Sequence, residues 1–141
     1  MNIIRQGSAV TIKLGPFLDD TDGITAETGL SIVQADIRLS KNGGAFAQTN
    51  NAAGATHDEN GWYGIPLDTT DTDTSGTLTI AVTKSGAMPV FSDYIVMAQQ
   101  AYDSLFGTSL LQVDATRISG SSAAADALEA NIGNLDTALS T

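Results

Sequence analysis

The chain has 141 residues, a length near that of one domain, and its 16 acidic and 6 basic side chains give a formal charge of −10. Because basic side chains are what hold a phosphate backbone, this balance disfavours nucleic acid as a partner. The sequence has no cysteine, which excludes disulfides and thiolate metal sites. It also has no apolar run of the roughly eighteen residues that a membrane helix needs, so we expect no membrane partner.

The first strand is predicted at residues 9–14. Val10, Ile12 and Leu14 alternate there with small or polar residues, which is the period of a half-buried strand. Gly15-Pro16 should end this strand, because proline offers no N–H to a neighbouring strand. An Asp-rich turn at residues 19–23 and a loop to about residue 28 are expected to follow.

A second and clearer strand is predicted at residues 30–40, where the apolar positions 33, 35, 37 and 39 alternate with polar ones. The next four residues are Lys41-Asn42-Gly43-Gly44. Asn-Gly and Gly-Gly accept the positive φ of a tight hairpin turn, so residues 45–48 should return antiparallel to this strand.

The polar segment 49–60 is expected to be a surface loop, followed by a strand at residues 61–67. Pro66 should place the end of that strand at a sheet edge. A turn-forming run at 68–76 leads to a strand at 77–83, and a final strand is expected from about Tyr94, after a break at Ser92-Asp93.

These segments amount to about six or seven short strands at spacings of about eight to twenty residues. That pattern favours a mainly β fold over an α/β fold. We therefore expect residues 1–97 to form an immunoglobulin-like antiparallel β-sandwich. Residues 98–120 are interpreted as a linker, with a helical turn or ordered stretch at 99–106 and a short extended piece at 110–114.

Residues 121–141 predict a short C-terminal helix. Ser121 or Ser122 is a plausible N-cap for a helix from residue 123 to about residue 139. Asn131, Gly133 and Asn134 are poor helix formers, so the helix should need a partner for its stability. Its apolar residues are spaced by three and four, which puts them on one seam suited to self-association. They are Ala125, Leu128, Ile132, Leu135 and Leu139.

Two acidic segments are candidate cation sites. Residues 71–76 match the first half of a calcium loop, but the twelfth position is Val82 in place of a bidentate glutamate. A turn held by Asx hydrogen bonds is the favoured interpretation, with calcium as the alternative. Asp19, Asp20 and Asp22 could surround a metal or supply the paired carboxylates of a glycosidase, although adjacent carboxylates in a turn are usually solvated. We expect no resident metal and no cofactor.

The remaining candidates are aromatic. His57 is the only histidine and is interpreted as a surface-loop residue, so neither a metal cage nor a nucleophile turn is expected. Trp62 and Tyr63 are the candidate partner-binding residues, able to stack on a sugar or anchor an interface. Because they are adjacent in a predicted strand, one should face the core and the other a partner.

Seven strings of the chain share a further pattern: residues 14–17, 22–23, 35–46, 57–63, 67–76, 102–105 and 111–114. Together they resemble a family of tailed-bacteriophage virion proteins, over about residues 8 to 120. The resemblance implies an N-terminal β module that attaches a fibre or appendage protein to the particle, followed by a trimeric stalk, and it implies no catalytic residues.

The residues and the resemblance lead to one leading hypothesis. The chain is expected to be a non-enzymatic structural protein of a phage virion, whose β domain docks on a capsid, neck or tail protein and whose C-terminal helices form a homotrimer. Within the same class, the alternative is a capsid decoration or head-fibre protein. A carbohydrate-binding module is an alternative from another class, and a glycan-cleaving enzyme is a weaker one.

Overall fold

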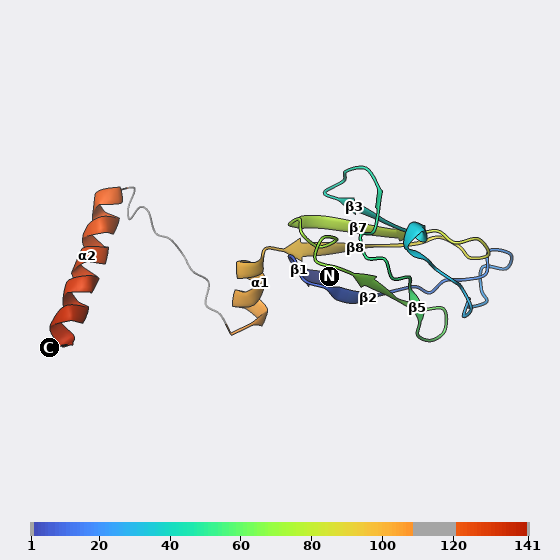
Figure 1. Cartoon of the computed structure of the whole chain (residues 1–141), viewed down its shortest axis with the longest axis horizontal. Helices are drawn as coiled ribbons and strands as arrows, with labels where there is room; N and C mark the ends of the chain where they lie inside the picture. Colours follow the sequence, from blue (N-terminus) through green and yellow to red (C-terminus); the bar gives the residue numbers. More distant parts are fainter. Residues whose placement is uncertain (1, 109–120, 141) are drawn as a thin grey trace. The chain divides into compact units, whose positions relative to one another are not determined.

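The computed structural model describes residues 2–108 and 121–140. It divides into two compact units, residues 1–109 and 110–141. The first unit is mainly β, with two sheets of five and three strands, and the second contains a C-terminal helix (Figure 1). The mainly β prediction is therefore confirmed.

The larger sheet has the strand order β1-β8-β7-β3-β4. Its neighbours are antiparallel except β1 and β8, which run parallel, with Ile3 beside Ile95. The prediction of purely antiparallel strands is wrong at this pair. Alternation over three residues is too short to mark β1 in the sequence. The strands are β1 (Ile3–Arg5), β3 (Ile37–Lys41), β4 (Ala47–Gln48), β7 (Gly76–Val82) and β8 (Val90–Met97).

The smaller sheet has the order β2-β6-β5, formed by β2 (Val10–Leu14), β6 (Tyr63–Leu67) and β5 (Thr56–His57). β5 pairs only with the first two residues of β6, so Pro66 lies where β6 has β2 as its single neighbour. The predicted edge position of Pro66 is confirmed. The predicted continuous loop at 49–60 is wrong at Thr56 and His57, which form β5.

The strands predicted at 9–14 and 77–83 are confirmed as β2 and β7, but the other boundaries differ. Residues 34–36 form the short 3-10 helix η1 (Gln34–Asp36) instead of a strand. The Asp36 carboxylate accepts the Val33 N–H at 2.9 Å and a Lys84 hydrogen bond at 2.8 Å, which turns the backbone before β3. The predicted break at Ser92-Asp93 is absent, because Asp93 pairs with Thr79 of β7 and accepts its hydroxyl at 2.6 Å.

Two hairpins close with the same Asn-Gly chemistry. The predicted turn is confirmed: Asn42 and Gly43 have φ of 52° and 72°, and the Gly44 N–H donates to the Lys41 carbonyl at 3.0 Å. A second turn, not predicted, joins β5 to β6, where Asn60 and Gly61 have φ of 47° and 79°. There the Trp62 N–H donates to the Glu59 carbonyl at 2.8 Å. Positive φ at both central positions is the signature of the type I′ turn.

One hydrophobic core lies between the two sheets and uses the inward positions of nearly every strand. Tyr63 is fully buried at its centre. Its ring meets Phe17 edge-on at 5.3 Å, and its hydroxyl donates to the Glu27 carbonyl while accepting the Leu30 N–H. This single side chain therefore fixes the long connection between β2 and β3. Other fully buried core residues are Ile37, Ile65, Leu67, Leu78, Ile80 and Val82.

Helix α1 (Gln99–Phe106) follows β8 directly and belongs to the same unit as the sheets (Figure 1). Asp103 of α1 accepts two hydrogen bonds from Arg5 of β1, at 2.7 and 2.8 Å. The helix is thus tied to the strand that lies next to β8. The predicted extended piece at 110–114 lies outside the described residues.

In the second unit, helix α2 (Ser122–Leu139) has 18 residues. The Ser121 side chain accepts the Ala124 N–H at 3.3 Å, which confirms Ser121 as the N-cap. No helix in residues 2–108 or 121–140 is long and apolar enough to cross a bilayer.

Candidate functional site

The most exposed apolar side chains of the second unit lie along α2. Leu128, Ile132, Leu135 and Leu139 are 50%, 58%, 63% and 86% exposed in the single chain, whereas Ala125 is buried. Steps of four, three and four residues keep the four exposed positions on one face of the helix. Burying a contiguous apolar stripe that is exposed to water is strongly favourable in free energy.

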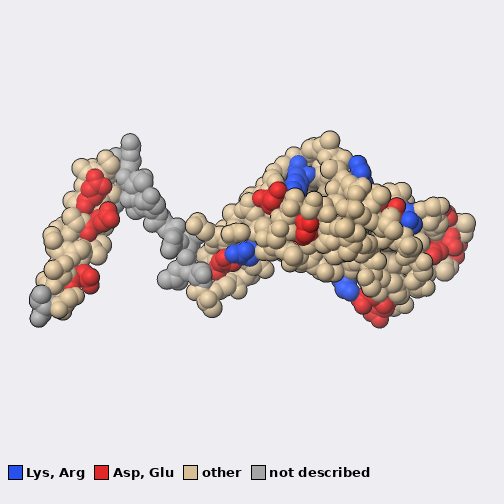
Figure 2. Space-filling view, in the orientation of Figure 1, with Lys and Arg blue, Asp and Glu red and all other residues tan. Residues whose placement is uncertain are grey.

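The acidic side chains of α2 are Asp126, Glu129 and Asp136. Glu129 and Asp136 lie three and four residues from Ile132, so they border the stripe. Figure 2 shows the acidic side chains of this helix in red along one side. An amphipathic helix whose apolar stripe is bordered by carboxylates suits an assembly in which the carboxylates stay in solvent. The predicted self-association residues are thus brought together on α2, with Ala125 already covered.

The structure separates the two predicted partner-binding aromatics. Tyr63 is buried in the core with both hydrogen-bonding capacities of its hydroxyl occupied, so it cannot contact a partner from this position. Trp62 is 39% exposed and follows the Asn60-Gly61 turn at the start of β6. Its indole packs on Gly15, where a Cβ atom would lie 3.1 Å from Trp62 Cδ2. Trp62 alone remains a candidate surface contact.

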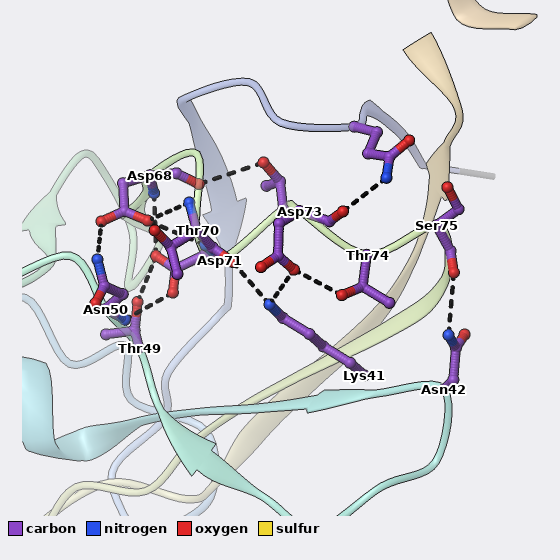
Figure 3. A network of polar contacts seen from close by, with 12 residues as sticks. Lys41, Asn42, Thr49, Asn50, Asp68, Thr70, Asp71, Asp73, Thr74 and Ser75 are labelled. Carbon is purple, nitrogen blue, oxygen red and sulfur yellow. Dashed lines mark hydrogen bonds and ion pairs between the residues drawn. The ribbon is translucent and has the colours of Figure 1, made fainter.

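The segment considered as a calcium loop forms a hydrogen-bonded network with the connection after β4 (Figure 3). Asp71 is only 3% exposed, and its carboxylate faces protein donors. It accepts the Thr49 hydroxyl at 2.9 Å and the N–H groups of Asn50, Asn51 and Asp68 at 2.6, 3.3 and 3.0 Å. The carboxylate thus holds backbone donors that would otherwise be buried without partners.

This network joins two of the connections that cross between the sheets. Residues 49–55 run from β4 to β5, and residues 68–75 run from β6 to β7. Asp68 strengthens the junction, since the Asn50 side-chain amide donates to it at 2.6 Å. That bond, together with the N–H groups of Asp71 and Thr70, lowers the pKa of Asp68. The network is structural, and sequence reasoning missed it because its donors come from both connections.

Asp73, at the rim of the same network, is exposed. Lys41 Nζ lies 2.6 Å from its carboxylate and also donates to the Thr70 carbonyl at 2.7 Å. The Lys41 hydrogen bond, followed by that of the Thr74 hydroxyl, lowers the pKa of Asp73. Lys41 and Asp71 line an open groove of about 540 Å³ together with Leu39 and Ala47. The two charged groups of this groove, Lys41 and Asp71, are therefore already occupied by protein partners.

Ion pairing leaves the surface strongly acidic. Four basic side chains each bind one carboxylate at 2.6 to 2.8 Å: Arg5 with Asp103, Lys13 with Asp58, Lys41 with Asp73 and Lys84 with Asp36. Figure 2 shows red patches without blue neighbours on the loops of the first unit. The described surface therefore offers no basic cluster for a phosphate backbone.

The second candidate cation site, at residues 19–22, consists of local turns. Asp19 accepts the Thr21 N–H at 2.7 Å, and Asp22 accepts the N–H groups of Ile24 and Thr25 at 2.8 Å. The Thr25 hydroxyl and these N–H groups lower the pKa of Asp22. Among residues 2–108 and 121–140, no three acidic or histidine side chains are grouped so that they could hold a metal ion.

His57 is not the surface-loop residue that the sequence suggested. It lies in β5, partly buried, with its ring 5.1 Å from that of Tyr63. Its Nε2 atom is buried and has no hydrogen-bond partner among the described residues. A buried imidazole nitrogen without a hydrogen-bond partner costs stability.

Comparisons with protein-family models, curated proteins and solved structures find no match to this chain.

Proposed function

We propose that this chain is a non-enzymatic structural component of a tailed-bacteriophage virion. It acts as a fibre or appendage attachment protein that docks on the particle through its β unit and trimerises through α2. The observation that carries the assembly part is the stripe of Leu128, Ile132, Leu135 and Leu139, each at least half exposed in the single chain. The phage assignment rests on the sequence resemblance.

We assign the β unit to the immunoglobulin-like sandwiches on the strength of its strand orders. Such sandwiches have one sheet with neighbouring G, F and C strands, extended by C′ in the variable type, and a second sheet that contains B, E and D. The orders β8-β7-β3-β4 and β2-β6-β5 correspond to G-F-C-C′ and B-E-D in the same chain sequence. The chain has no cysteine for the inter-sheet disulfide of antibody domains, so the hydrophobic core stabilises the sandwich.

The energetics of α2 favour assembly. Fully covering an exposed aliphatic side chain contributes about 1.5 to 3 kcal/mol. Because the four positions are 50 to 86% exposed, covering them offers about 4 to 8 kcal/mol per chain before ordering costs. An isolated helix of this length with a central glycine is marginal in water. Association through the stripe would supply the missing stability, and a left-handed bundle uses this three-four spacing.

The test is the mass of the native chain in solution. We expect a trimer by size-exclusion chromatography with light scattering, and monomers for the double variant Leu128→Asp/Leu135→Asp. The matched control Ala130→Asp/Asn134→Asp adds two carboxylates on the opposite side of α2 and should remain trimeric. A monomeric wild type, or a trimer that persists with both stripe aspartates, would refute α2 as the assembly element.

The virion location has a separate test. Antibody against this chain should label purified phage particles in electron micrographs. Labelling at a tail or neck favours the appendage role, whereas labelling over the head favours a capsid decoration or head-fibre protein. Purified particles that carry none of the chain would refute the structural role.

A carbohydrate-binding role has one observation in its favour, the exposed Trp62. Lys13 of β2 pairs with Asp58, which follows β5 and donates its N–H to the Trp62 carbonyl at 2.8 Å. Both side chains of this pair are about half exposed and offer donors and acceptors to a sugar. Binding would quench or shift the fluorescence of this single tryptophan when polysaccharides are added. An unchanged spectrum and a silent glycan array would remove this alternative.

A further inference from the structure

Two hairpins of this protein place the same dipeptide in the same backbone conformation. Asn42-Gly43 and Asn60-Gly61 both occupy the central positions of a turn closed by an i to i+3 hydrogen bond, with φ between 47° and 79° at all four residues. Asparagine before glycine is the pair in which a backbone nitrogen most easily reaches a side-chain amide, because glycine has no side chain to hinder the approach. The two turns therefore allow a comparison in which only the surroundings differ.

The surroundings hold the Asn42 amide in place. Its Nδ2 donates to the Ser75 carbonyl at 3.0 Å, and its Oδ1 accepts the Thr77 N–H at 2.8 Å. Gly76 lies so close that a Cβ atom there would overlap the Asn42 side chain. Bringing the Asn42 Cγ atom to the Gly43 nitrogen would break both hydrogen bonds.

The Asn60 amide has no such restraint. Asn60 is exposed, and no residue in the described part of the chain hydrogen-bonds its side chain. The Gly61 carbonyl accepts the Phe17 N–H at 2.8 Å, but the Gly61 N–H donates to no described acceptor. The nucleophilic nitrogen and the amide carbon of this turn are thus both unengaged.

We infer that Asn60 is a site of spontaneous covalent modification, where the native fold permits deamidation through a succinimide while protecting Asn42. The Gly61 nitrogen bonds to Asn60 Cγ, the Cγ–Nδ2 bond breaks, and ammonia leaves with the proton from Gly61. Water then opens one of the two imide C–N bonds. Opening at one gives aspartate, and opening at the other gives isoaspartate, whose backbone contains an additional methylene.

The modification would alter the hairpin that presents Trp62. It adds a carboxylate beside Asp58 and Glu59, which are already acidic. The isoaspartyl form also lengthens a two-residue turn whose closing bond runs from the Trp62 N–H to the Glu59 carbonyl. The candidate surface contact would then change with the age of the protein, independently of whether α2 trimerises.

The test is a time course of the full chain at mildly alkaline pH and physiological temperature, in the folded state and in urea. Peptide mass spectrometry in heavy-oxygen water measures deamidation at both sites, and isoaspartyl methyltransferase labelling measures the isoaspartyl fraction. In the folded chain we expect Asn60 to react at least about tenfold faster than Asn42, because freeing Asn42 breaks two hydrogen bonds. In urea the two sites should react at similar rates.

The variant Asn60→Gln, which keeps a neutral amide but disfavours the five-membered ring, should remove the signal at residue 60 and leave residue 42 unchanged. Two results would overturn the inference. One is equal reactivity of Asn42 and Asn60 in the folded chain. The other is an unreactive Asn60 in the folded chain alongside reaction of both sites in urea.

Discussion

Replacing Asp71 with alanine should destabilise the β unit more than any other change to an acidic side chain in the loop network. The carboxylate is 3% exposed and accepts four hydrogen bonds, three from backbone N–H groups and one from the Thr49 hydroxyl. A hydrogen bond to a charged group contributes about 1.5 to 3 kcal/mol, and a buried donor left unpaired costs about 1 to 3 kcal/mol. Water entering the vacated space would satisfy some of these donors.

We therefore expect Asp71→Ala to lower the free energy of unfolding by about 3 to 5 kcal/mol, a large share of the stability of a domain. Urea titration of the full chain, followed by the fluorescence of Trp62, measures this change. The matched control is Asp73→Asn, which removes the exposed pair with Lys41 and should leave the midpoint almost unchanged. If the free energy of unfolding of Asp71→Ala lay within about 1 kcal/mol of the wild-type value, the buried carboxylate would not be the junction of the two connections.

Three further outcomes follow from the described contacts. His57→Phe should raise the free energy of unfolding by about 1 kcal/mol, because it removes a buried nitrogen without a partner and keeps the ring contact; a lower urea midpoint would contradict this. Asp103→Asn should speed amide hydrogen exchange in α1 with little effect on the sheets, because it weakens the pair of hydrogen bonds from Arg5. Unchanged exchange would show that α1 is held by other contacts. Since the folded pKa of Asp68 lies below its unfolded value, the stabilisation from its hydrogen bonds is present above about pH 4 and is lost as the pH falls through the folded value. Thermal denaturation should show a plateau near neutral pH and a decline below about pH 4, and a stability maximum in acid would contradict this sign.

The sequence predicted correctly those strands and turns whose formation depends on residues close together in the chain. β2 and β7 show clean alternation over five and seven residues, and the Asn42-Gly43 turn has the residues that its backbone requires. The Asn60-Gly61 turn carried the same signal, but β5 has only two residues and offers no alternation beside it. A search for Asn-Gly alone would have found this second hairpin.

The errors arose where a side chain acts over a distance. Asp36 matches the alternation of a strand, yet its bonds to Val33 and Lys84 make a helical turn. For Asp71 the sequence favoured a turn over calcium, but it did not reveal that Thr49 and the N–H groups of Asn50 and Asn51 occupy the carboxylate oxygens. Apart from Val33, which is three residues from Asp36, those partners are 20 to 48 residues away, and no spacing rule along the chain reports them.

The position of β8 determines how the β unit responds to tension on its C-terminal side. The chain leaves the sheet along β8, which lies between β1 and β7 instead of at a border. A force applied along the axis of β8 would load the hydrogen bonds to both neighbouring strands in shear at the same time, and the hydrogen bonds between Arg5 and Asp103 would transfer part of the load to β1. Inter-strand hydrogen bonds that are loaded in shear must break together, whereas those of an edge strand that is peeled away break one at a time. The central place of β8 would thus let the β unit resist a force applied at the end of this strand.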